Sequence, residues 1–302
     1  MPQVVAERPG ASWARAAGLE WWPVDTLLST YLLGTGLVIF WQRLRIPAAA
    51  VLLGLHLAGV AAILALAWLN RARPSSAWRL FRYWYPLLYI GGCYREMAVL
   101  IQSLRGVEFD AVMARWDLWL WGVYPTLWLE RFYRPWLTEI MQLLYTLFFF
   151  ALIGVAGWLW REHKVEQFRY YAFAVTLGFL SSFVGYFLVP VRGPRFLLAH
   201  LHQAPLQGLW ISSALRATLD LLESTHYDCF PSGHVALTLI ACWGARSVSP
   251  RLARIYLLYA GLMTFSTVYL RYHYTVDLMA GALLAALVLW AAPRLYGEGR
   301  GS

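Results

Sequence analysis

The chain has 302 residues, of which 60% are hydrophobic and 17% aromatic, and its formal net charge is +9. A mean hydropathy of +0.52 and long apolar blocks are typical of a membrane protein and exclude an ordinary soluble domain. The arginines stand in short segments between the blocks, without a basic stripe or a fold signature for nucleic acid, which excludes nucleic acid as a partner. The composition predicts an all-α, polytopic integral membrane protein.

The first 23 residues precede the first apolar block. Residues 1–18 are mostly small or polar, and Trp21, Trp22 and Pro23 are typical of the girdle at a membrane interface. The apolar run starts late and lacks a small-residue cleavage site, so we expect a retained anchor and no cleaved signal. Segment 1–23 is predicted to be cytoplasmic or interfacial, and segment 293–302 is predicted to be a C-terminal tail.

About eight apolar segments are each roughly long enough to cross a bilayer. They are 24–41, 47–69, 83–104, 139–160, 168–189, 231–248, 254–271 and 273–292. Basic residues follow the second, fourth and sixth segments, which predicts that these loops and both termini are cytoplasmic. These residues are Arg71, Arg73, Arg79, Arg82, Arg161, Lys164, Arg169, Arg246, Arg251 and Arg254. We therefore expect a cell (inner) membrane protein whose opposite loops face the external or periplasmic side.

The predicted organisation is N-terminal transmembrane helices over 24–104, interfacial helices over 105–138 and a catalytic transmembrane core over 139–292. Inside the third span, Arg95 and Glu96 are expensive charges, which favours either pairing with another span or lining a substrate cavity. Segment 106–135 is too polar to span and too aromatic for a free loop. Its tryptophans are Trp116, Trp119, Trp121 and Trp128. They predict amphipathic helices that either anchor the chain in the interface or form a wall of a lipid-entry groove.

Three short motifs follow the fifth span in chain order. In Pro190-Val191-Arg192-Gly193-Pro194-Arg195 the prolines and the glycine end the helix, and two arginines are placed at the membrane face. In Pro231-Ser232-Gly233-His234 the first two residues favour a helix start, where free amides bind anions. Tyr227 and Asp228 precede this turn and are candidates for binding a substrate headgroup.

The third motif places His273 and Asp277 four residues apart. On a helix this spacing puts both on one face, where the carboxylate can accept a proton from one imidazole nitrogen and leave the other as a nucleophile. The two apolar segments before His273 form a hairpin, so His234 and His273 are expected to emerge on the same side of the membrane.

Together these motifs resemble the signature of the type 2 phosphatidic acid phosphatase superfamily. The Phe109-Asp110 segment, the tryptophan-rich region and the Tyr-His-Tyr-x-Val-Asp-Leu ending resemble the branch that contains inositolphosphorylceramide synthases and their bacterial relatives. The resemblance covers most of the chain from the third span onward and implies a six-helix phosphatase-like core.

The resemblance also implies roles for the site residues. His273 would attack phosphorus to form a phosphohistidine, Asp277 would hold its tautomer, and His234 would protonate the leaving alkoxide and then activate the acceptor. Non-bridging phosphate oxygens would bind Ser232 and the Gly233 amide, with Arg192 or Arg195 neutralising their charge, as in-line phosphoryl transfer requires. This chemistry needs no cofactor or metal.

Two positions depart from the superfamily pattern. No lysine precedes the first arginine around Gly185 and Tyr186, and Ser266-Thr267 stands where the pattern has Ser-Arg. Arg271 is two residues before His273 and is a candidate for the lost phosphate-binding charge, although residues two apart on a helix do not share a face.

A zinc site is the competing interpretation of Cys229, His234, His273 and Asp277, but no close ligand pair of the His-x-x-x-His kind is present, so we expect no metal. The partners expected are a membrane lipid substrate and the bilayer, and the sequence defines no oligomeric state. Two reactions stay open, namely hydrolysis of a lipid phosphate and transfer of a phospho-alcohol headgroup to a hydroxylated lipid. A non-catalytic lipid-binding or transport protein is the minor alternative.

Overall fold

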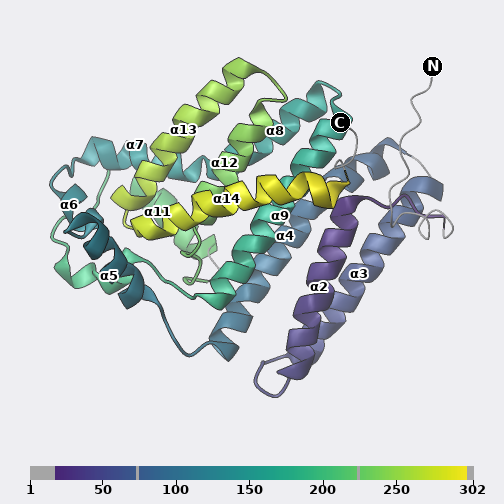
Figure 1. Cartoon of the computed structure of the whole chain (residues 1–302), viewed down its shortest axis with the longest axis horizontal. Helices are drawn as coiled ribbons and strands as arrows, with labels where there is room; N and C mark the ends of the chain where they lie inside the picture. The colour runs from purple at the N-terminus through teal and green to yellow at the C-terminus, as the bar shows by residue number, and fades with distance from the viewer. Residues whose placement is uncertain (1–17, 73–74, 223–224, 298–302) are drawn as a thin grey trace. The chain divides into compact units, whose positions relative to one another are not determined.

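The computed structural model describes residues 18–72, 75–222 and 225–297. Within these ranges the chain is helical, with no strand and one isolated parallel bridge between Val191 and Asp228, which confirms the all-α prediction (Figure 1). The helices are α2 (Pro23–Trp41), α3 (Ala49–Ala72), α4 (Ser76–Leu104), α5 (Asp110–Trp121), α6 (Pro125–Glu130), α7 (Pro135–Thr146), α8 (Phe148–Arg161), α9 (Val165–Leu188), α10 (Pro194–Leu197), the 3-10 turn η1 (Ala199–Leu201), α11 (Ser212–Leu222), α12 (Gly233–Ala245), α13 (Pro250–Tyr269) and α14 (Thr275–Tyr296).

Four described helices are long and apolar enough to cross a membrane, namely α2, α3, α9 and α14. Helices α7 and α8 pass the same test as one span bent by 43°. The predicted number of spans, eight, is larger because three of the predicted spans correspond to helices that are too short or too charged to pass this test. Helix α12 has only 13 residues, α4 carries several charges, and α13 begins with two arginines. The protein is thus a polytopic helical membrane protein, and the count of eight stays a prediction.

The chain forms two compact units, Met1–Gly92 with Ala291–Ser302, and Cys93–Trp290. In the first unit α2 packs on α3. Arg82 is fully buried there, donates to both carboxylate oxygens of Asp25 and lies 4.1 Å over the ring of Trp22. The sequence predicts Arg82 to be a cytoplasmic loop cation, whereas in the structure it is the partner of a buried carboxylate. Within this unit Arg82 therefore holds α4 to the start of α2.

The second unit is built around α12, which packs against α8, α9 and α13. Apolar on all sides, this short helix is buried between its neighbours, as such a composition requires. Gly178 permits the close approach of α9 to α12, since a Cβ at this position would lie 2.8 Å from a side-chain atom of Ile240 and 2.9 Å from one of Leu237. Helix α13 packs in turn on α7. The start of α12 is thereby fixed at the centre of the unit.

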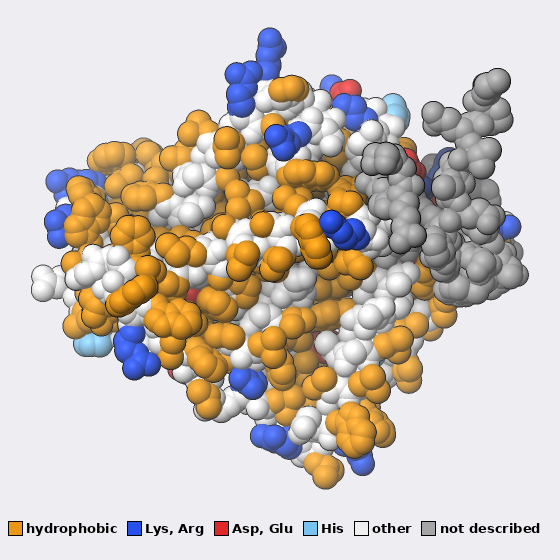
Figure 2. Space-filling model, viewed as in Figure 1, with side chains coloured by type: hydrophobic (Ala, Val, Ile, Leu, Met, Phe, Trp, Pro, Cys, Tyr) orange, Lys and Arg blue, Asp and Glu red, His pale blue; other side chains and the backbone are white. Residues whose placement is uncertain are grey.

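Segment 106–135 contains two short helices, α5 and α6, before α7 begins. Its tryptophans are exposed, with Trp119 showing 81% of its surface, and hydrophobic side chains cover much of the face in Figure 2. This exposure agrees with the predicted helices, whose place in the membrane interface stays a prediction. Inside α4, Glu96 is buried and Arg95 is exposed, so the two adjacent charges do face different surroundings.

Candidate active site

One pocket of the second unit collects residues from all three motifs. Its lining consists of Tyr145, Arg192, Arg195, Asp228, Cys229, His234, Tyr272 and His273. The candidate residues Arg192, Arg195, His234 and His273 are thus brought together, and so is Asp228 from the predicted headgroup pair. Residues up to 128 positions apart in the sequence line this one small space.

The start of α12 forms one wall of the site. Ser232 is the N-cap residue, and its hydroxyl accepts from the amide of Val235 at 3.3 Å, as the sequence predicts. The same hydroxyl lies 3.3 Å from Nε2 of His273, and the Ser232 amide donates to the carbonyl of Asp277 at 3.0 Å. A Cβ at Gly281 would collide with the Ser232 carbonyl, so a glycine at this position allows α14 to approach the cap closely.

His273 and Asp277 face each other, although for a different reason from the one expected. Helix α14 begins at Thr275, so His273 lies in the connection before it and the assumption of one continuous helical face is wrong. Nδ1 of His273 is nevertheless 3.5 Å from Oδ2 of Asp277, which also accepts from the amide of Tyr274 at 2.9 Å. Asp277 therefore caps its own helix as in a capping box and is held rigidly beside the imidazole.

The pair is deeply buried, with His273 2% exposed and Asp277 fully buried. Nδ1 of His273 and Oδ1 of Asp277 have no hydrogen-bond partner in the structure. Contacts of this kind are often long in a ligand-free enzyme and shorten when substrate binds. The geometry leaves Nε2 directed toward Ser232 and the pocket.

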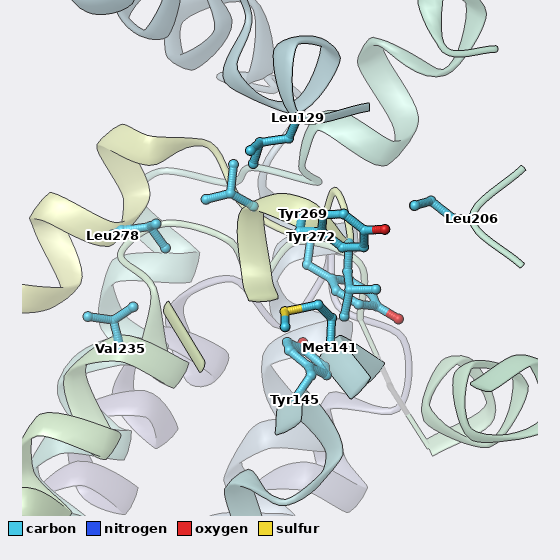
Figure 3. Packing of buried hydrophobic residues seen from close by; sticks show 10 residues of the cluster. Leu129, Met141, Tyr145, Leu206, Val235, Tyr269, Tyr272 and Leu278 are labelled. Atoms are coloured by element: carbon cyan, nitrogen blue, oxygen red, sulfur yellow. The ribbon is translucent and has the colours of Figure 1, made fainter. Parts of the chain in front are cut away.

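His234 is enclosed by aromatic rings. Tyr145 stacks on it with ring centroids 4.6 Å apart, Phe148 lies at 4.5 Å, and His273 lies at 5.8 Å. Tyr145 also stacks on Tyr272 at 4.4 Å, and Figure 3 shows these two tyrosines within the buried cluster. No sequence pattern marks Tyr145 or Phe148, because both come from the broken span α7–α8, far from any motif.

The two motif arginines are held by aromatic faces and acidic side chains. The guanidinium of Arg192 lies 4.3 Å from the ring centroid of Phe196 and 4.0 Å from Glu108. Arg195 donates to Asp220 at 2.8 Å and lies 4.8 Å over Tyr272. Both cations are thus positioned at the pocket while remaining partly solvated.

Three further predicted residues, Arg271, Tyr227 and Gly233, are not among the residues that line the pocket. Arg271 is not among the pocket-lining residues, because it donates to the carbonyl of Ala204 at 2.9 Å and pairs with Glu130 at 3.4 Å. Tyr227 is also not in the lining, since its hydroxyl donates to Glu108 at 2.8 Å. Gly233 opens α12 against Tyr186, whose hydroxyl would collide with a Cβ at that position.

Cys229, His273 and Asp277 place ligand atoms within 4.8 Å of one another, close enough to be considered for a metal. The thiol of Cys229 donates to the carbonyl of Tyr272 at 3.0 Å. Burial, with the nearby carboxylates of Asp277 and Asp228, raises the pKa of this thiol well above its ordinary value. The expectation that no metal binds at this cluster stays a prediction.

Residues 112–291, more than half of the chain, match the model of the PAP2 superfamily. The chain belongs to this superfamily. A PA-phosphatase related-family protein of Dictyostelium discoideum is 28% identical over 180 residues, which are 53% of this chain and 32% of that protein. The chain therefore covers about a third of that relative. No solved structure matches the chain.

The matched range contains all three motifs, and it begins within α5. Membership of the PAP2 superfamily and the named relative support a phosphatase-type enzyme embedded in a membrane. The resemblance to the inositolphosphorylceramide synthase branch is not tested by either match and stays a prediction.

Proposed function

We propose that this PAP2 superfamily protein removes or transfers the phosphoryl group of a membrane lipid through a covalent phosphohistidine at His273. The observation that carries the proposal is the pocket in which His273, His234 and two arginines meet at the capped start of α12. A nucleophile, a proton donor and cations in one small space are what phosphoryl transfer requires.

In the first step, Nε2 of His273 attacks phosphorus while the bond between phosphorus and the lipid oxygen breaks. Asp277, 3.5 Å from Nδ1, favours the tautomer that carries the proton on Nδ1 and leaves the Nε2 lone pair free. His234 gives a proton to the departing oxygen. In the second step His234 takes a proton from the acceptor, whose oxygen attacks phosphorus as the bond to Nε2 breaks.

The charge on the phosphoryl oxygens would be balanced by Arg192 and Arg195, with the Ser232 hydroxyl and the first amides of α12 as hydrogen-bond donors. We infer that the pocket faces the external or periplasmic side, because the loops with the larger number of basic residues lie on the other side of the predicted topology.

Transfer of a phospho-alcohol headgroup is the second candidate, and the burial of the site favours it. His273 is 2% exposed, and His234 lies between the rings of Tyr145 and Phe148. A phosphohistidine in such surroundings is shielded from water, which would allow an alcohol to compete as acceptor. This arrangement would fit a synthase such as the branch that the motifs resemble.

A two-substrate assay with purified protein in detergent tests the proposal. Wild type, His273→Ala and the exposed control His200→Ala are incubated with a lipid phosphomonoester, or with a phosphodiester phospholipid plus a hydroxylated lipid. We expect free phosphate or a headgroup-transferred lipid from wild type and His200→Ala, and neither from His273→Ala. Free phosphate would identify a phosphatase and transferred headgroup a synthase. The absence of any product that depends on His273 would refute the proposal.

A further inference from the structure

Helix α5 carries two buried carboxylates outside the three motifs. Asp110 and Asp117 are 5% and 1% exposed and stand seven residues apart, which places them on one face about two helical turns apart. Burial raises the pKa of both carboxyl groups, so keeping them ionised here costs free energy. The hydrogen bonds that the two carboxylates accept offset this cost.

Asp110 holds the arginine motif. Its Oδ2 accepts from the amide of Arg192 at 2.9 Å, and its Oδ1 accepts from the amide of Gly193 at 2.8 Å and from the hydroxyl of Tyr274 at 3.1 Å. The adjacent Phe109 amide donates to the carbonyl of Pro190 at 3.0 Å. The backbone on which both phosphate-binding arginines stand is thereby tied to the start of α5.

Asp117 holds the start of α14. Its Oδ2 accepts from the amide of Thr275 at 3.0 Å, and its Oδ1 accepts from the Thr275 hydroxyl at 2.6 Å and from the amide of Val276 at 3.1 Å. These amides belong to the first turn of α14, where the N–H groups have no acceptor within the helix. Asp277 lies in that same turn, and His273 lies two residues before Thr275.

Both carboxylates use both oxygens as acceptors for backbone amides, so we expect that an amide side chain does not replace them. An Asn at either position would turn an NH₂ group toward a backbone N–H and leave two donors opposed. The exposed side chains of the same helix carry no such constraint.

We propose that Asp110 and Asp117 are positioning residues, through which α5 holds the arginine motif and the histidine–aspartate pair in place relative to each other. This inference rests on the proposed function, because the two segments that α5 holds form the site where phosphate would bind. Neither carboxylate touches the reacting atoms. Asp110 sets the place of the two arginines, and Asp117 sets the place of Asp277 relative to His273.

The two residues therefore have different kinetic signatures. Loss of the Asp110 contacts displaces Arg192 and Arg195 and weakens phosphate binding, so KM and the inhibition constant for inorganic phosphate rise. Loss of the Asp117 contacts disturbs the orientation of the nucleophile, so kcat falls while phosphate binding is kept. A merely structural role would change the amount of folded enzyme and leave KM and phosphate binding as they are.

The test compares Asp110→Asn, Asp117→Asn and the exposed control Arg115→Gln from the same helix. Each full-length variant in detergent is measured for KM, kcat, inhibition by inorganic phosphate, and the shift of its thermal midpoint on adding phosphate. We expect at least about tenfold weaker phosphate inhibition and a smaller phosphate-induced shift for Asp110→Asn. For Asp117→Asn we expect at least about a tenfold fall in kcat with an unchanged phosphate-induced shift.

Thr275→Val and Thr275→Ser test the α14 contact from its other side. Thr275→Val should lower kcat in the same way as Asp117→Asn, and Thr275→Ser, which keeps the hydroxyl, should restore it. Values within twofold of Arg115→Gln for both aspartate variants would overturn the inference, and so would a wild-type thermal midpoint that phosphate does not shift. If the phosphate-induced shifts of the thermal midpoint follow this pattern but no product depends on His273, the positioning role of Asp110 and Asp117 is supported and the proposed reaction is refuted.

Discussion

Gly193 is the position where one added methyl group should disable the site. Its backbone has φ 103° and ψ 164°, a combination that is nearly restricted to glycine. A Cβ built there would lie 2.5 Å from the carbonyl oxygen of Tyr272 and 2.8 Å from Sγ of Cys229. The first of these atoms belongs to backbone next to His273, so no side-chain rotation can relieve the overlap.

The expected size of the effect of Gly193→Ala follows from two contributions. The backbone conformation alone costs an alanine about 1–3 kcal/mol, which lowers the population of the competent geometry about 5- to 150-fold. Relief of the overlap then requires the arginine motif to move away from the connection before α14, and a displacement of about 1 Å near a reacting centre costs about 100-fold. We expect kcat/KM to fall at least about 100-fold.

The assay measures kcat/KM and the thermal midpoint of Gly193→Ala beside Gly261→Ala. Gly261 lies on an exposed face of α13, where nothing lies within 4 Å of a built Cβ, so its replacement should leave activity unchanged and favour the helix slightly. A Gly193→Ala enzyme with kcat/KM within twofold of wild type would refute the argument that this backbone contact sets the distance between the arginines and His273.

Three further predictions concern packing and charge. Tyr145→Phe should keep kcat within about threefold, because the stack on His234 needs only a ring, whereas Tyr145→Ala should lower kcat about tenfold or more, as steady-state kinetics would record. Arg82→Ala should destabilise the first unit by about 3–5 kcal/mol, since Asp25 is left buried without its partner, and thermal or denaturant unfolding in detergent measures this. Burial alone would raise the pKa of Glu130, but hydrogen bonds and a nearby cation outweigh it and lower that pKa, so this carboxylate stabilises the fold above its ordinary pKa of about 4.3. That stability should be lost as pH falls from this ordinary value through the lowered pKa of the folded protein, and Glu130→Gln should flatten the thermal midpoint against pH over this range.

The sequence contained enough information for the class of fold and for most of the pocket. Helix starts are local, so Ser232 is correctly predicted as the cap of α12, although Pro231 lies before the cap and outside the helix. The spacing of His273 and Asp277 brought the two side chains together even though the helix begins only at Thr275. A capping arrangement and a helical face place residues four apart at similar separations, and spacing alone does not distinguish them.

The remaining parts of the site depend on tertiary contacts that leave no local pattern. Tyr145 stacks on His234 from the end of α7, beside the bend between α7 and α8. Asp110 and Asp117 lie in the segment that the sequence predicts to be interfacial, and their carboxylates accept from backbone amides about 80 and 160 residues away in sequence. Backbone donors exist at every residue except proline, so no sequence motif marks them.

The contacts of Arg271 show how the charge of the site is distributed. Its hydrogen bond to the carbonyl of Ala204 and its ion pair with Glu130 hold its guanidinium outside the pocket lining. The cations left for phosphate are Arg192 and Arg195, and each already has an acidic partner: Glu108, 47% exposed, and Asp220, 43% exposed.

Ion pairs with such exposed partners contribute little, about 0–1 kcal/mol, so a phosphate that enters the pocket can displace them at small cost. The fully buried pair of Arg82 and Asp25 could not be exchanged in this way, because separating it would strand a charge in a dry interior. The exposure of the acidic partner therefore distinguishes Arg192 and Arg195, which can exchange that partner for a phosphate, from Arg82, which is fixed in the fold. The sequence predicts the first two to bind phosphate and Arg82 to be a cytoplasmic loop cation, and burial of its partner Asp25 is what the sequence does not mark.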